Sequence, residues 1–394
     1  MANVVPLKDL CLIDITDGTH QTPTYVDDGY IFLSSKNVTS GVIDWENVMY
    51  IPESLHSDLY KRIAPQKNDI LLAKNGTTGV AAIVDRDEIF DIYVSLALIR
   101  PDPEKVLPKY LLHAINSDTT KRFFNSHLKG IGVPNLHLTH IRETPINVPS
   151  FSEQKDIINL LGKVGKVISL RKQQIAKLDE LVKARFVEMF GDINSKIQRY
   201  PVVKIGSCAK LQGGFAFKSS DYIDDGIRLV QISNVNKDTL DWDSINCVPQ
   251  AFLQKYKDFE LHVGDLILAM TRPVIKSLDA VKIATVSEND VPSLLNQRVG
   301  RFIIDEAKLN PLYLMLSCQM PEFREYVEAM SGNSLQPNIS SKQVEEYSIV
   351  LPPLALQEEF AAFVAQTDKQ KLTIQHSLDK LELMKKALMQ KYFG

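Results

Sequence analysis

The second half of this 394-residue chain repeats the first, and this duplication limits the possible fold more than any other feature of the sequence. The offset between matching positions drifts from 197, between Asp28 and Asp225, to 203, between Pro108 and Pro311. The chain's two tryptophans match each other, in Asp44-Trp45 and Asp241-Trp242. A period near 200 residues is too long for a solenoid unit, so the sequence predicts two copies of a domain, each followed by the same kind of tail.

Further matches follow in the same order through both halves. They are Asp28-Gly29 with Asp225-Gly226, Asn37-Val38 with Asn234-Val235, Asn68 to Ala73 with Gly264 to Ala269, Pro108 to Leu112 with Pro311 to Met315, Pro134-Asn135-Leu136 with Pro337-Asn338-Ile339, and Phe190-Gly191 with Phe393-Gly394. Matches of this length and order are improbable by chance. We therefore divide the chain into globular parts at 1–149 and 192–352 and tails at 150–191 and 353–394.

The globular parts are predicted to be of the α+β class. Short β-type runs alternate with helical patterns in both. The runs are Gly79 to Val84, Tyr93 to Ile99, Leu261 to Ala269 and Arg298 to Ile304, and the helical stretches are Lys109 to Ser126 and Leu312 to Met330. Long polar loops connect them, as expected where binding rather than packing selects the residues.

The tails are predicted to be long helices with a coiled-coil seam. Apolar residues recur in steps of four and three, which is the period of paired helices. A Ser150-x-x-Glu153 capping box after Pro149 predicts where the first helix begins, and Gly191 predicts where it ends. Gly162 and Gly165 weaken that helix, so we expect tertiary contacts or a close backbone approach there. The seam residues are Ile157, Leu161, Val164, Ile168, Ile175, Leu178 and Val182 in the first tail, and Phe360, Val364, Ile374, Leu378, Leu381 and Leu388 in the second.

Each seam needs a partner helix, and the simplest partner is the other tail. The first helix delivers the chain to the second globular part, so the second helix is expected to run back, which gives an antiparallel coiled coil with approximate two-fold symmetry. Two similar heads would then be held at a fixed separation within one chain.

The composition indicates a globular protein, and its overall charge does not indicate binding to nucleic acid or membrane. Hydrophobic residues make up 44% of the chain, and 45 basic residues against 48 acidic ones leave a net charge of −3. The sequence contains neither an apolar run near the 18 residues of a membrane span nor a signal-like start, so a cytoplasmic location is expected. Its four cysteines are far apart and form no metal-ligand pattern, so no metal site is predicted.

Catalytic motifs are incomplete wherever they are suggested. Gly213 to Ser219 has a Lys-Ser pair at P-loop spacing, but Phe217 replaces the glycine that must wrap a phosphate. His137-x-x-His140 has no further ligand set, and Asp102 and Glu104 lie in a turn made by Pro101 and Pro103. The sequence therefore predicts a non-enzymatic chain with no catalytic residues.

The remaining candidate functional residues lie in polar loops. Both globular parts have such loops, but the residues in them differ. Amide and arginine side chains can read base edges, whereas lysine, serine and threonine hold phosphates. Asn37 and Asn234 repeat, which favours a structural role for them; positions that differ are better candidates for base contacts. The candidate DNA-binding residues are Thr19, His20, Gln21, Lys36, Lys74, Asn75, Thr77 and Thr78 in the first part, and Lys218, Ser219, Thr271, Arg272, Lys276, Asn296, Gln297 and Arg298 in the second.

The whole chain resembles the specificity (S) subunit of type I restriction–modification enzymes. The resemblance rests on three loop motifs, two helix junctions and the duplicated arrangement of head and helix. The motifs are Asp17 to Pro23, Lys74 to Gly79 and Gly214 to Ser219, with junctions at Val148-Pro149-x-x-x-Glu153-Gln154 and Leu351-Pro352-x-x-x-Leu356-Gln357. Leu356 departs from the glutamate of the first junction, which weakens one local contact.

The resemblance implies two target recognition domains that read the halves of a bipartite, asymmetric double-stranded DNA site. It also implies that the helices act as a spacer and as a scaffold for two methyltransferase (M) subunits, through which restriction (R) subunits join for DNA modification and cleavage. S-adenosylmethionine would be bound by the methyltransferase, and ATP and Mg by the restriction partner, so this chain is expected to hold no cofactor.

Two other hypotheses remain open from the sequence alone. The chain could be a non-catalytic coiled-coil adaptor whose heads bind protein, which heads without clustered positive surface would favour. It could also be a nuclease or hydrolase with an unrecognised site, which a metal-dependent activity of the purified chain would reveal.

Overall fold

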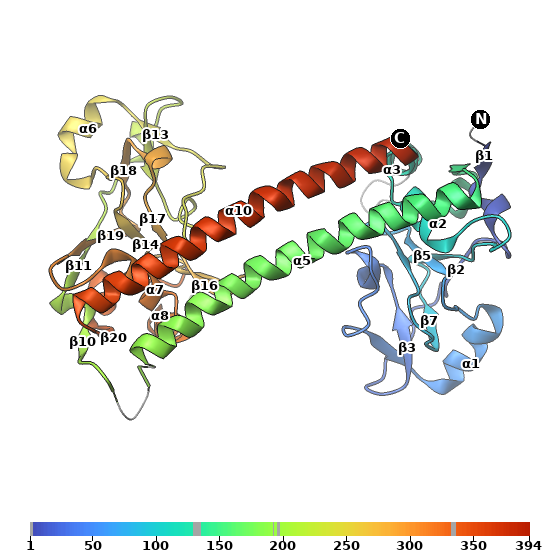
Figure 1. Ribbon diagram of the computed structural model, residues 1–394, viewed down its shortest axis with the longest axis horizontal. Coiled ribbons are helices and arrows are strands. Elements are labelled where there is room, and N and C mark those ends of the chain that lie inside the picture. Colours follow the sequence, from blue (N-terminus) through green and yellow to red (C-terminus); the bar gives the residue numbers. More distant parts are fainter. Residues whose placement is uncertain (1–2, 129–134, 192, 195–197, 332–335) are drawn as a thin grey trace. The chain divides into compact units, whose positions relative to one another are not determined.

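The chain packs as two compact units in the computed structural model, which describes residues 3–128, 135–191, 193–194, 198–331 and 336–394 (Figure 1). Unit 1 consists of Met1–Gln174 and Ile374–Gly394, and unit 2 consists of Ile175–Thr373. Each unit therefore holds one globular part and a half of each long helix. Pro134, part of one predicted repeat, lies outside the described residues.

Unit 1 is built on three small sheets. A four-stranded antiparallel sheet has the order β2-β8-β5-β6, and a three-stranded sheet has the order β4-β3-β7 with β3 and β7 parallel. A third pair, β1 with β9, closes the part of the globular domain next to the helices. The strands are β1 (Asn3–Pro6), β2 (Thr16–Asp17), β3 (Tyr30–Leu33), β4 (Met49–Ile51), β5 (Ile70–Ala73), β6 (Ala81–Ile83), β7 (Phe90–Ile92), β8 (Leu96–Ile99) and β9 (Pro145–Val148).

Unit 2 repeats this topology strand for strand. Its four-stranded sheet has the order β11-β19-β14-β17, and its three-stranded sheet has the order β13-β12-β18 with β12 and β18 parallel. Strands β10 and β20 pair as β1 and β9 do, and a hairpin of β15 and β16 is added. The strands are β10 (Val202–Lys204), β11 (Ala209–Gly213), β12 (Ile227–Val230), β13 (Cys247–Val248), β14 (Leu266–Ala269), β15 (Val274–Ile275), β16 (Ala280–Val281), β17 (Ile283–Thr285), β18 (Ser293–Leu295) and β19 (Val299–Ile304), with β20 (Ser348–Val350). The predicted duplication and α+β class are confirmed.

Short helices cover the sheets in both units. Unit 1 has α1 (Glu53–Arg62), α2 (Pro108–Ile115), α3 (Asp118–Ser126) and α4 (Leu138–Arg142), and unit 2 has α6 (Ala251–Lys255), α7 (Pro311–Cys318), α8 (Pro321–Ser331) and α9 (Ser341–Glu346). The two helical stretches predicted as continuous are each broken in two. Ser117 caps α3 by accepting a hydrogen bond from the Thr120 amide, and Pro321 starts α8. Both residues are helix starters rather than interior residues.

Two long helices follow the globular parts, as ends of the repeated units. Helix α5 spans Phe151–Phe190 and helix α10 spans Leu354–Phe393. The Ser150 amide donates to the Glu153 carboxylate at 2.9 Å, and Gly191 has a φ of +83°, a left-handed conformation that suits glycine after a helix. None of the described helices is both long and apolar enough to cross a lipid bilayer.

A buried glutamine fixes the start of each long helix. The Gln154 side chain accepts from the Leu107 amide at 2.8 Å and donates to the Pro149 carbonyl at 2.9 Å. Gln357 repeats both bonds in unit 2, with the Asn310 amide and the Pro352 carbonyl. The junction motif is therefore a polar clamp that ties helix to head, and it persists although Leu356 replaces the glutamate.

The two long helices pair antiparallel, as predicted, and Figure 1 shows α5 in green beside α10 in red. In unit 1 the first half of α5 meets the last half of α10, with Lys172 and Glu382 paired at 2.8 Å. In unit 2 the last half of α5 meets the first half of α10, with Asp179 and Lys371 paired at 2.6 Å.

The predicted seam residues face inward along both helices. No predicted seam side chain is fully exposed: Ile157, Leu161, Val164, Val182, Phe360, Val364 and Leu378 are buried, and Ile168, Ile175, Leu178, Ile374, Leu381 and Leu388 are half-buried. Of the two alternatives for the turn at Gly162 and Gly165, the structure favours tertiary contacts over a close backbone approach, because a Cβ at either position would meet nothing within 4 Å. The burial of Leu161 and Val164 holds that turn instead.

Aromatic residues connect each helix end to its head. In unit 1 Phe393 lies 5.2 Å from the Tyr110 ring, and in unit 2 Phe190 lies 4.9 Å from the matching Tyr313 ring. The tyrosine hydroxyls donate to the Asn147 and Val350 carbonyls at 2.8 and 2.7 Å. The repeated Phe-Gly and Tyr motifs thus form one structural joint, used twice.

His113 gives unit 1 a pH-dependent stability. Burial, together with the nearby Lys385 and Lys109, lowers the pKa of His113 to about 4. In the unfolded chain His113 binds a proton near pH 6.5, whereas in the folded unit it binds one only near pH 4. The free energy of unfolding is therefore highest above pH 6.5 and decreases as the pH falls from 6.5 to 4. We expect a loss of about 3 kcal/mol, measurable by urea unfolding with hydrogen exchange in α2.

The matched variant is His113→Leu, because Leu316 occupies the corresponding position in unit 2. It is expected to remove most of the loss between pH 6.5 and 4. An unchanged pH profile in this variant would show that another group titrates.

Candidate nucleic-acid interface

Loops from four strands of unit 1 meet at one end of its sheets. The Lys74 amide donates to the Ser95 carbonyl at 2.9 Å, and the Ser35 amide donates to the Ser95 hydroxyl at 3.0 Å. Thr19 pairs with Tyr93 through a parallel bridge. The predicted residues that follow β2, β3 and β5 are therefore brought together, around the turn between β7 and β8.

A buried ion pair organises this end. The Lys74 ammonium lies 2.6 Å from the Asp17 carboxylate, and each side chain is only 8% exposed. Asp17 also faces the His20 imidazole at 3.3 Å. The Lys74 charge is thus compensated inside the unit, which suits positioning of the loop, while His20 projects into solvent. Gln21, Lys36 and Thr77 are exposed as well.

Asn75 has a buried hydrogen-bond acceptor that no described residue uses. Its backbone pairs with Asn135, and the side-chain carbonyl oxygens of both residues are buried without a partner among the described residues. Gly76 and Gly79, with φ of +77° and +86°, make the tight turn, and Thr78 donates to the Gly76 carbonyl. An unpartnered amide oxygen can accept a hydrogen bond from an amino group of a ligand.

The same end of unit 2 is assembled from the matching loops. The Met270 amide donates to the Arg298 carbonyl at 2.8 Å, and Phe215 pairs with Asn296. Thr271 and Asn296 are buried, and the Thr271 hydroxyl donates to the Asn338 side chain. The exposed predicted residues here are Arg272, Gln297 and Arg298, with Lys276 on the added hairpin and Lys218 and Ser219 beyond the buried Phe217.

Arg272 stands where unit 1 has Gly76. Its φ is +47°, a strained conformation for a residue with a side chain. Its amide donates to the Pro337 carbonyl at 2.8 Å, which fixes the backbone. Arg272 and burial together lower the pKa of Lys282, with burial the larger cause. Residues with strained backbones are enriched at functional sites, so this turn is a candidate part of the interface.

The shared residues of the two ends are structural, as predicted for the repeated asparagines. The Asn37 amide donates to the Asp44 and Asn47 carbonyls, and the Asn234 amide donates to the Asp241 and Ser244 carbonyls. Both asparagines are buried. They hold the loop framework while the exposed residues around them differ.

Sequence reasoning missed the turn between β7 and β8 in unit 1. Tyr93, Val94 and Ser95 lie 203 residues before the candidate residues Asn296, Gln297 and Arg298. Applying the repeat offset to the second set finds the first. Thr22 and Tyr93, whose hydroxyls lie 3.4 Å apart, extend the surface of this turn.

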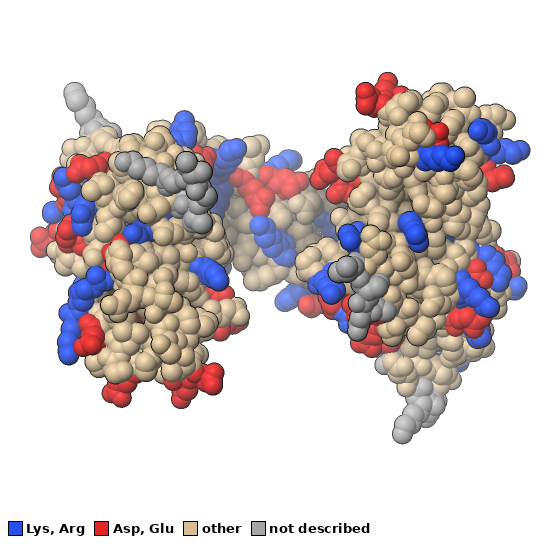
Figure 2. Space-filling view, turned by 180° about the vertical axis from the view of Figure 1, so that it is seen from behind, with Lys and Arg blue, Asp and Glu red and all other residues tan. Residues whose placement is uncertain are grey.

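Charge of both signs is distributed over the chain. Figure 2 shows basic and acidic side chains mixed on the drawn face of both units, consistent with the net charge of −3. Binding of DNA phosphates scales with the number of charges neutralised. A chain with a net charge of −3 and mixed surface charge is therefore not expected to bind DNA phosphates strongly by itself.

Comparison with known proteins decides the family. A model of the type I restriction modification DNA specificity domain matches residues 2–180 and, a second time, residues 198–383. The chain belongs to this family. It is the DNA specificity subunit of a type I restriction–modification system and a non-catalytic member of that complex. Two matches to one domain follow the duplication seen in both sequence and fold.

Known relatives support the assignment along the chain. The type I restriction enzyme MjaVIII specificity subunit of Methanocaldococcus jannaschii is 25% identical over 341 residues, which cover 84% of this chain and 79% of that protein. The S subunit structure from M. genitalium superposes with a TM-score of 0.56 at 14% identity, covering 100% of this chain and 96% of that one. A chain from a structure on assembly and conformational transition of the type I R-M system gives a TM-score of 0.60 at 17% identity, with 100% and 97% covered. The structural likenesses show the fold.

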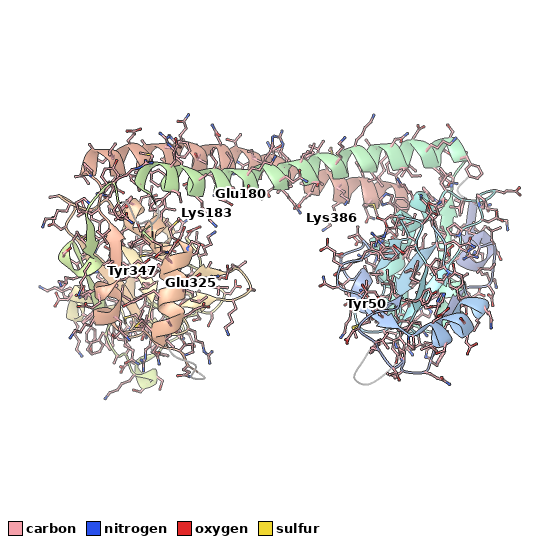
Figure 3. All side chains as sticks on the ribbon, turned by 90° about the horizontal axis from the view of Figure 1, so that it is seen from below. Tyr50, Glu180, Lys183, Glu325, Tyr347 and Lys386 are labelled. Carbon is pink, nitrogen blue, oxygen red and sulfur yellow. The ribbon has the colours of Figure 1, made fainter. Side chains whose placement is uncertain are left out.

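Two lysines on the long helices of the specificity subunit also repeat. Lys183 and Lys386 are 203 residues apart, and both are exposed. Figure 3 labels both below the helices, on the side of the globular parts, and Lys386 lines a groove with Asn116 and Asp118 of its own unit. They are candidates for phosphate contacts that sequence reasoning did not select.

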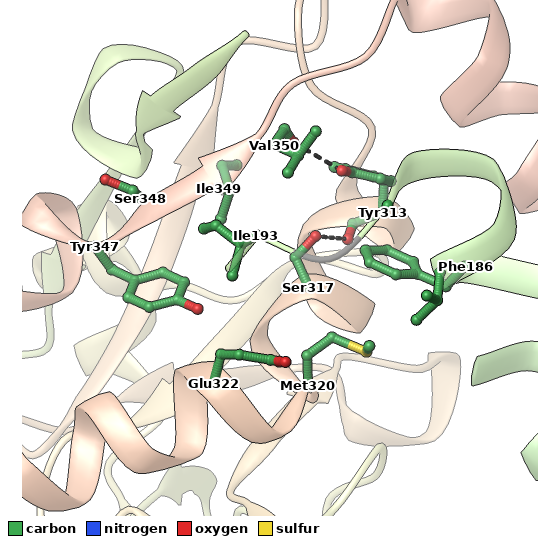
Figure 4. A pocket seen from close by; sticks show the side chains of 12 residues that line it. Phe186, Ile193, Tyr313, Ser317, Met320, Glu322, Tyr347, Ser348, Ile349 and Val350 are labelled. Carbon is green, nitrogen blue, oxygen red and sulfur yellow. Dashed lines mark hydrogen bonds between the residues drawn. The ribbon is translucent and has the colours of Figure 1, made fainter. Parts of the chain in front are cut away.

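An apolar pocket lies where α5 ends in unit 2 (Figure 4). Phe186, Met320 and Ile349 line it, beside the Tyr313 and Ser317 hydroxyls. Both hydroxyls are already used, because Tyr313 donates to the Val350 carbonyl and Ser317 donates to the Tyr313 carbonyl. The pocket belongs to the joint between helix and head.

Proposed function

We propose that the specificity subunit reads a bipartite, asymmetric double-stranded DNA site, with one globular part on each half-site. The observation that carries this proposal is the contrast between framework and surface. The two units repeat the same strand orders and the same buried asparagine bonds, yet the exposed residues of the loop ends differ. They are Gln21, Lys36 and Thr77 in unit 1, and Arg272, Gln297 and Arg298 in unit 2. One framework with two different reading surfaces suits two different half-sites.

The exposed residues at each end supply the chemistry for base reading. Arginine pairs bidentately with guanine, and amide side chains pair with adenine in the major groove. Arg272, Gln297 and Arg298 would read bases in unit 2, and Gln21 and Asn75 in unit 1. Lys183 and Lys386 would contact phosphates of the DNA between the half-sites. The continuous helices, shared by both units, would set the spacing.

We further propose that the long helices carry two methyltransferase subunits. Leu160, Val167 and Leu181 follow one another on α5 at multiples of seven residues, and they are 37%, 39% and 48% exposed. Leu170 adds to this stripe at 47%. A stripe of exposed leucine and valine along a paired helix supports docking of further helices. The methyltransferases would bind S-adenosylmethionine and supply phosphate contacts, and restriction subunits with ATP and Mg would join through them.

A selection from DNA with two randomised segments tests the division into half-sites. Gln21→Ala is expected to relax base preference in one half-site only, and Arg298→Ala in the other only. Each lost base contact is expected to cost about 5- to 150-fold in discrimination, because a good bidentate pair contributes about 1–3 kcal/mol. The measurement is the enriched sequence logo of the full chain with its methyltransferase.

Lys204→Ala is the control in unit 2. Lys204 is exposed at β10 and pairs with Glu346, away from the loop end, and exposed ion pairs contribute little. The control should leave both half-sites unchanged. A single variant that altered both half-sites would contradict one reading surface per unit.

A further inference from the structure

Unit 2 carries a structural element that unit 1 lacks. Thirteen residues, 270–282, connect β14 to β17, whereas seven residues, 74–80, connect the matching strands β5 and β6. The connection is six residues longer and contains the β15–β16 hairpin, with Val274 opposite Val281 and Ile275 opposite Ala280. Because the strand orders of the two units are otherwise the same, this hairpin is the largest addition at the candidate interface.

The hairpin belongs to the reading end of unit 2. The Lys282 amide donates to the Pro273 carbonyl at 2.7 Å, directly beside Arg272. The Lys282 ammonium donates to the Ile232 carbonyl at 3.1 Å, which joins the hairpin base to the loop that follows β12. That loop matches the one holding Lys36 in unit 1. The hairpin thus grows out of the same cluster of loops as Arg272 and Arg298.

Contacts on both sides hold the hairpin in place. Val281 is buried, and Val274 packs against the main hydrophobic core of unit 2. At the tip, the Asp279 carboxylate is paired with Arg324 of α8. An isolated two-stranded hairpin is only marginally stable in water, so these contacts are what pre-organise it.

The tip presents one apolar and several polar groups. Leu278 is 58% exposed, and Lys276 and Ser277 beside it are exposed too. Within the described part of the chain, the Lys276 and Arg272 side chains form no hydrogen bond or ion pair, while the one acid of the tip is neutralised by Arg324. Exposing a leucine to water at the tip of an ordered hairpin is unfavourable unless it contacts a partner. The basic residues beside it would suit DNA as that partner.

We infer that the β15–β16 hairpin is a two-stranded ribbon that enters the DNA major groove and gives unit 2 part of its base preference. The major groove admits such a ribbon and displays the thymine methyl group. Leu278 contacts a thymine methyl, and Lys276 donates to the acceptors of a neighbouring guanine. This inference rests on the proposed function, and it names an element and a base class that the proposed function does not.

Replacing thymine by uracil in the selected site tests the inference, since uracil lacks only the methyl group. With the full chain bound to its enriched site, wild type is expected to lose about fourfold in affinity at one thymine of the half-site that Arg298→Ala alters. Leu278→Ser is expected to bind the thymine and uracil sites equally. Leu278 is exposed, so this variant retains the fold.

Ile303→Ser is the matched control. Ile303 is an exposed apolar residue, 49% accessible, and lies at the far end of β19 from the loop cluster. It should keep the wild-type sensitivity to uracil. Equal sensitivity in Leu278→Ser and wild type, or no sensitive thymine in that half-site, would overturn the role of the hairpin alone. A full chain that selects no sequence at all would overturn the proposed function together with it.

Discussion

Gly18→Ala is expected to displace the loop that carries Thr19, His20 and Gln21, and to destabilise unit 1 by about 3 kcal/mol or more. A Cβ at Gly18 would stand 1.8 Å from the Ile92 carbonyl oxygen and 2.6 Å from the Tyr93 carbonyl carbon. Both are backbone atoms, so no side-chain rotation relieves the overlap. Thermal unfolding, with hydrogen exchange at Thr19 and Val94, measures the loss.

Gly162→Ala is the control for this prediction. It adds the same methyl group within unit 1, inside α5 and in open space, and should stabilise by about 1 kcal/mol because alanine favours a helix over glycine. The two changes are therefore expected to have opposite signs. An unchanged unfolding temperature in Gly18→Ala would mean that this loop does not lie against β7.

Gly214 extends the same argument to unit 2. A Cβ there would lie 2.3 Å from the Asn296 carbonyl oxygen, so both units need glycine where the first loop crosses the end of the three-stranded sheet. In DNA selection, Gly18→Ala should weaken preference in the half-site read by unit 1. If only the half-site altered by Arg298→Ala lost preference, unit 1 would have to be assigned to that half-site instead.

Much of the fold was predictable because the sequence contains two copies of the same domain and helix. Repeated short motifs predicted two similar units, and the four-three spacing predicted the seam, including the burial of Leu161, Val164 and Leu378. Phe186 was not predicted as a buried residue. Its ring packs on Tyr313 of the globular part at 5.4 Å and on Phe360 of α10 at 5.6 Å. It lies one residue beyond the position that the four-three spacing gives after Val182, so this spacing carries no signal for it.

Buried polar pairs that belong to one unit could not be predicted. His56 and Asp91 lie 2.7 Å apart in unit 1, and burial raises the pKa of Asp91, whereas the matching positions in unit 2 are Leu253 and Leu294. A polar pair and an apolar pair can fill the same space. Neither sequence position alone shows that it has a partner 35 residues away.

The candidate interface was predictable in position and less so in chemistry. The loop motifs predicted residues that the structure gathers at one end of each unit, and the repeat offset locates Ser95 among them. The sequence gives no sign that Lys74 is paired, because its partner Asp17 is 57 residues away and contacts it only across the sheet. The hairpin after Arg272 was equally hidden, since six added residues do not by themselves indicate two short strands.

Phe360→Ala is expected to destabilise unit 2 by about 3–5 kcal/mol, the usual cost of removing a large buried aromatic side chain. Phe360 has no exposed surface, and its ring lies 5.6 Å from Phe186 and 5.3 Å from Phe190 at the end of α5. Phe190 in turn packs against Tyr313 of the globular part. One side chain therefore joins the start of α10, the end of α5 and the head, and urea unfolding of the full chain measures its loss.

Phe363→Ala separates this joint from general loss of apolar area. Phe363 is on the same helix, 6.3 Å from Phe360, but only half-buried, so its removal should cost much less. If the joint fixes the head on the helices, Phe360→Ala at a temperature where it remains folded should also accept DNA sites whose half-site spacing differs by a base pair, while Phe363→Ala and wild type reject them. Strict spacing in a folded Phe360→Ala variant would place the control of spacing elsewhere, in the clamps made by Gln154 and Gln357, because those bonds would then be the remaining rigid connection between helix and head.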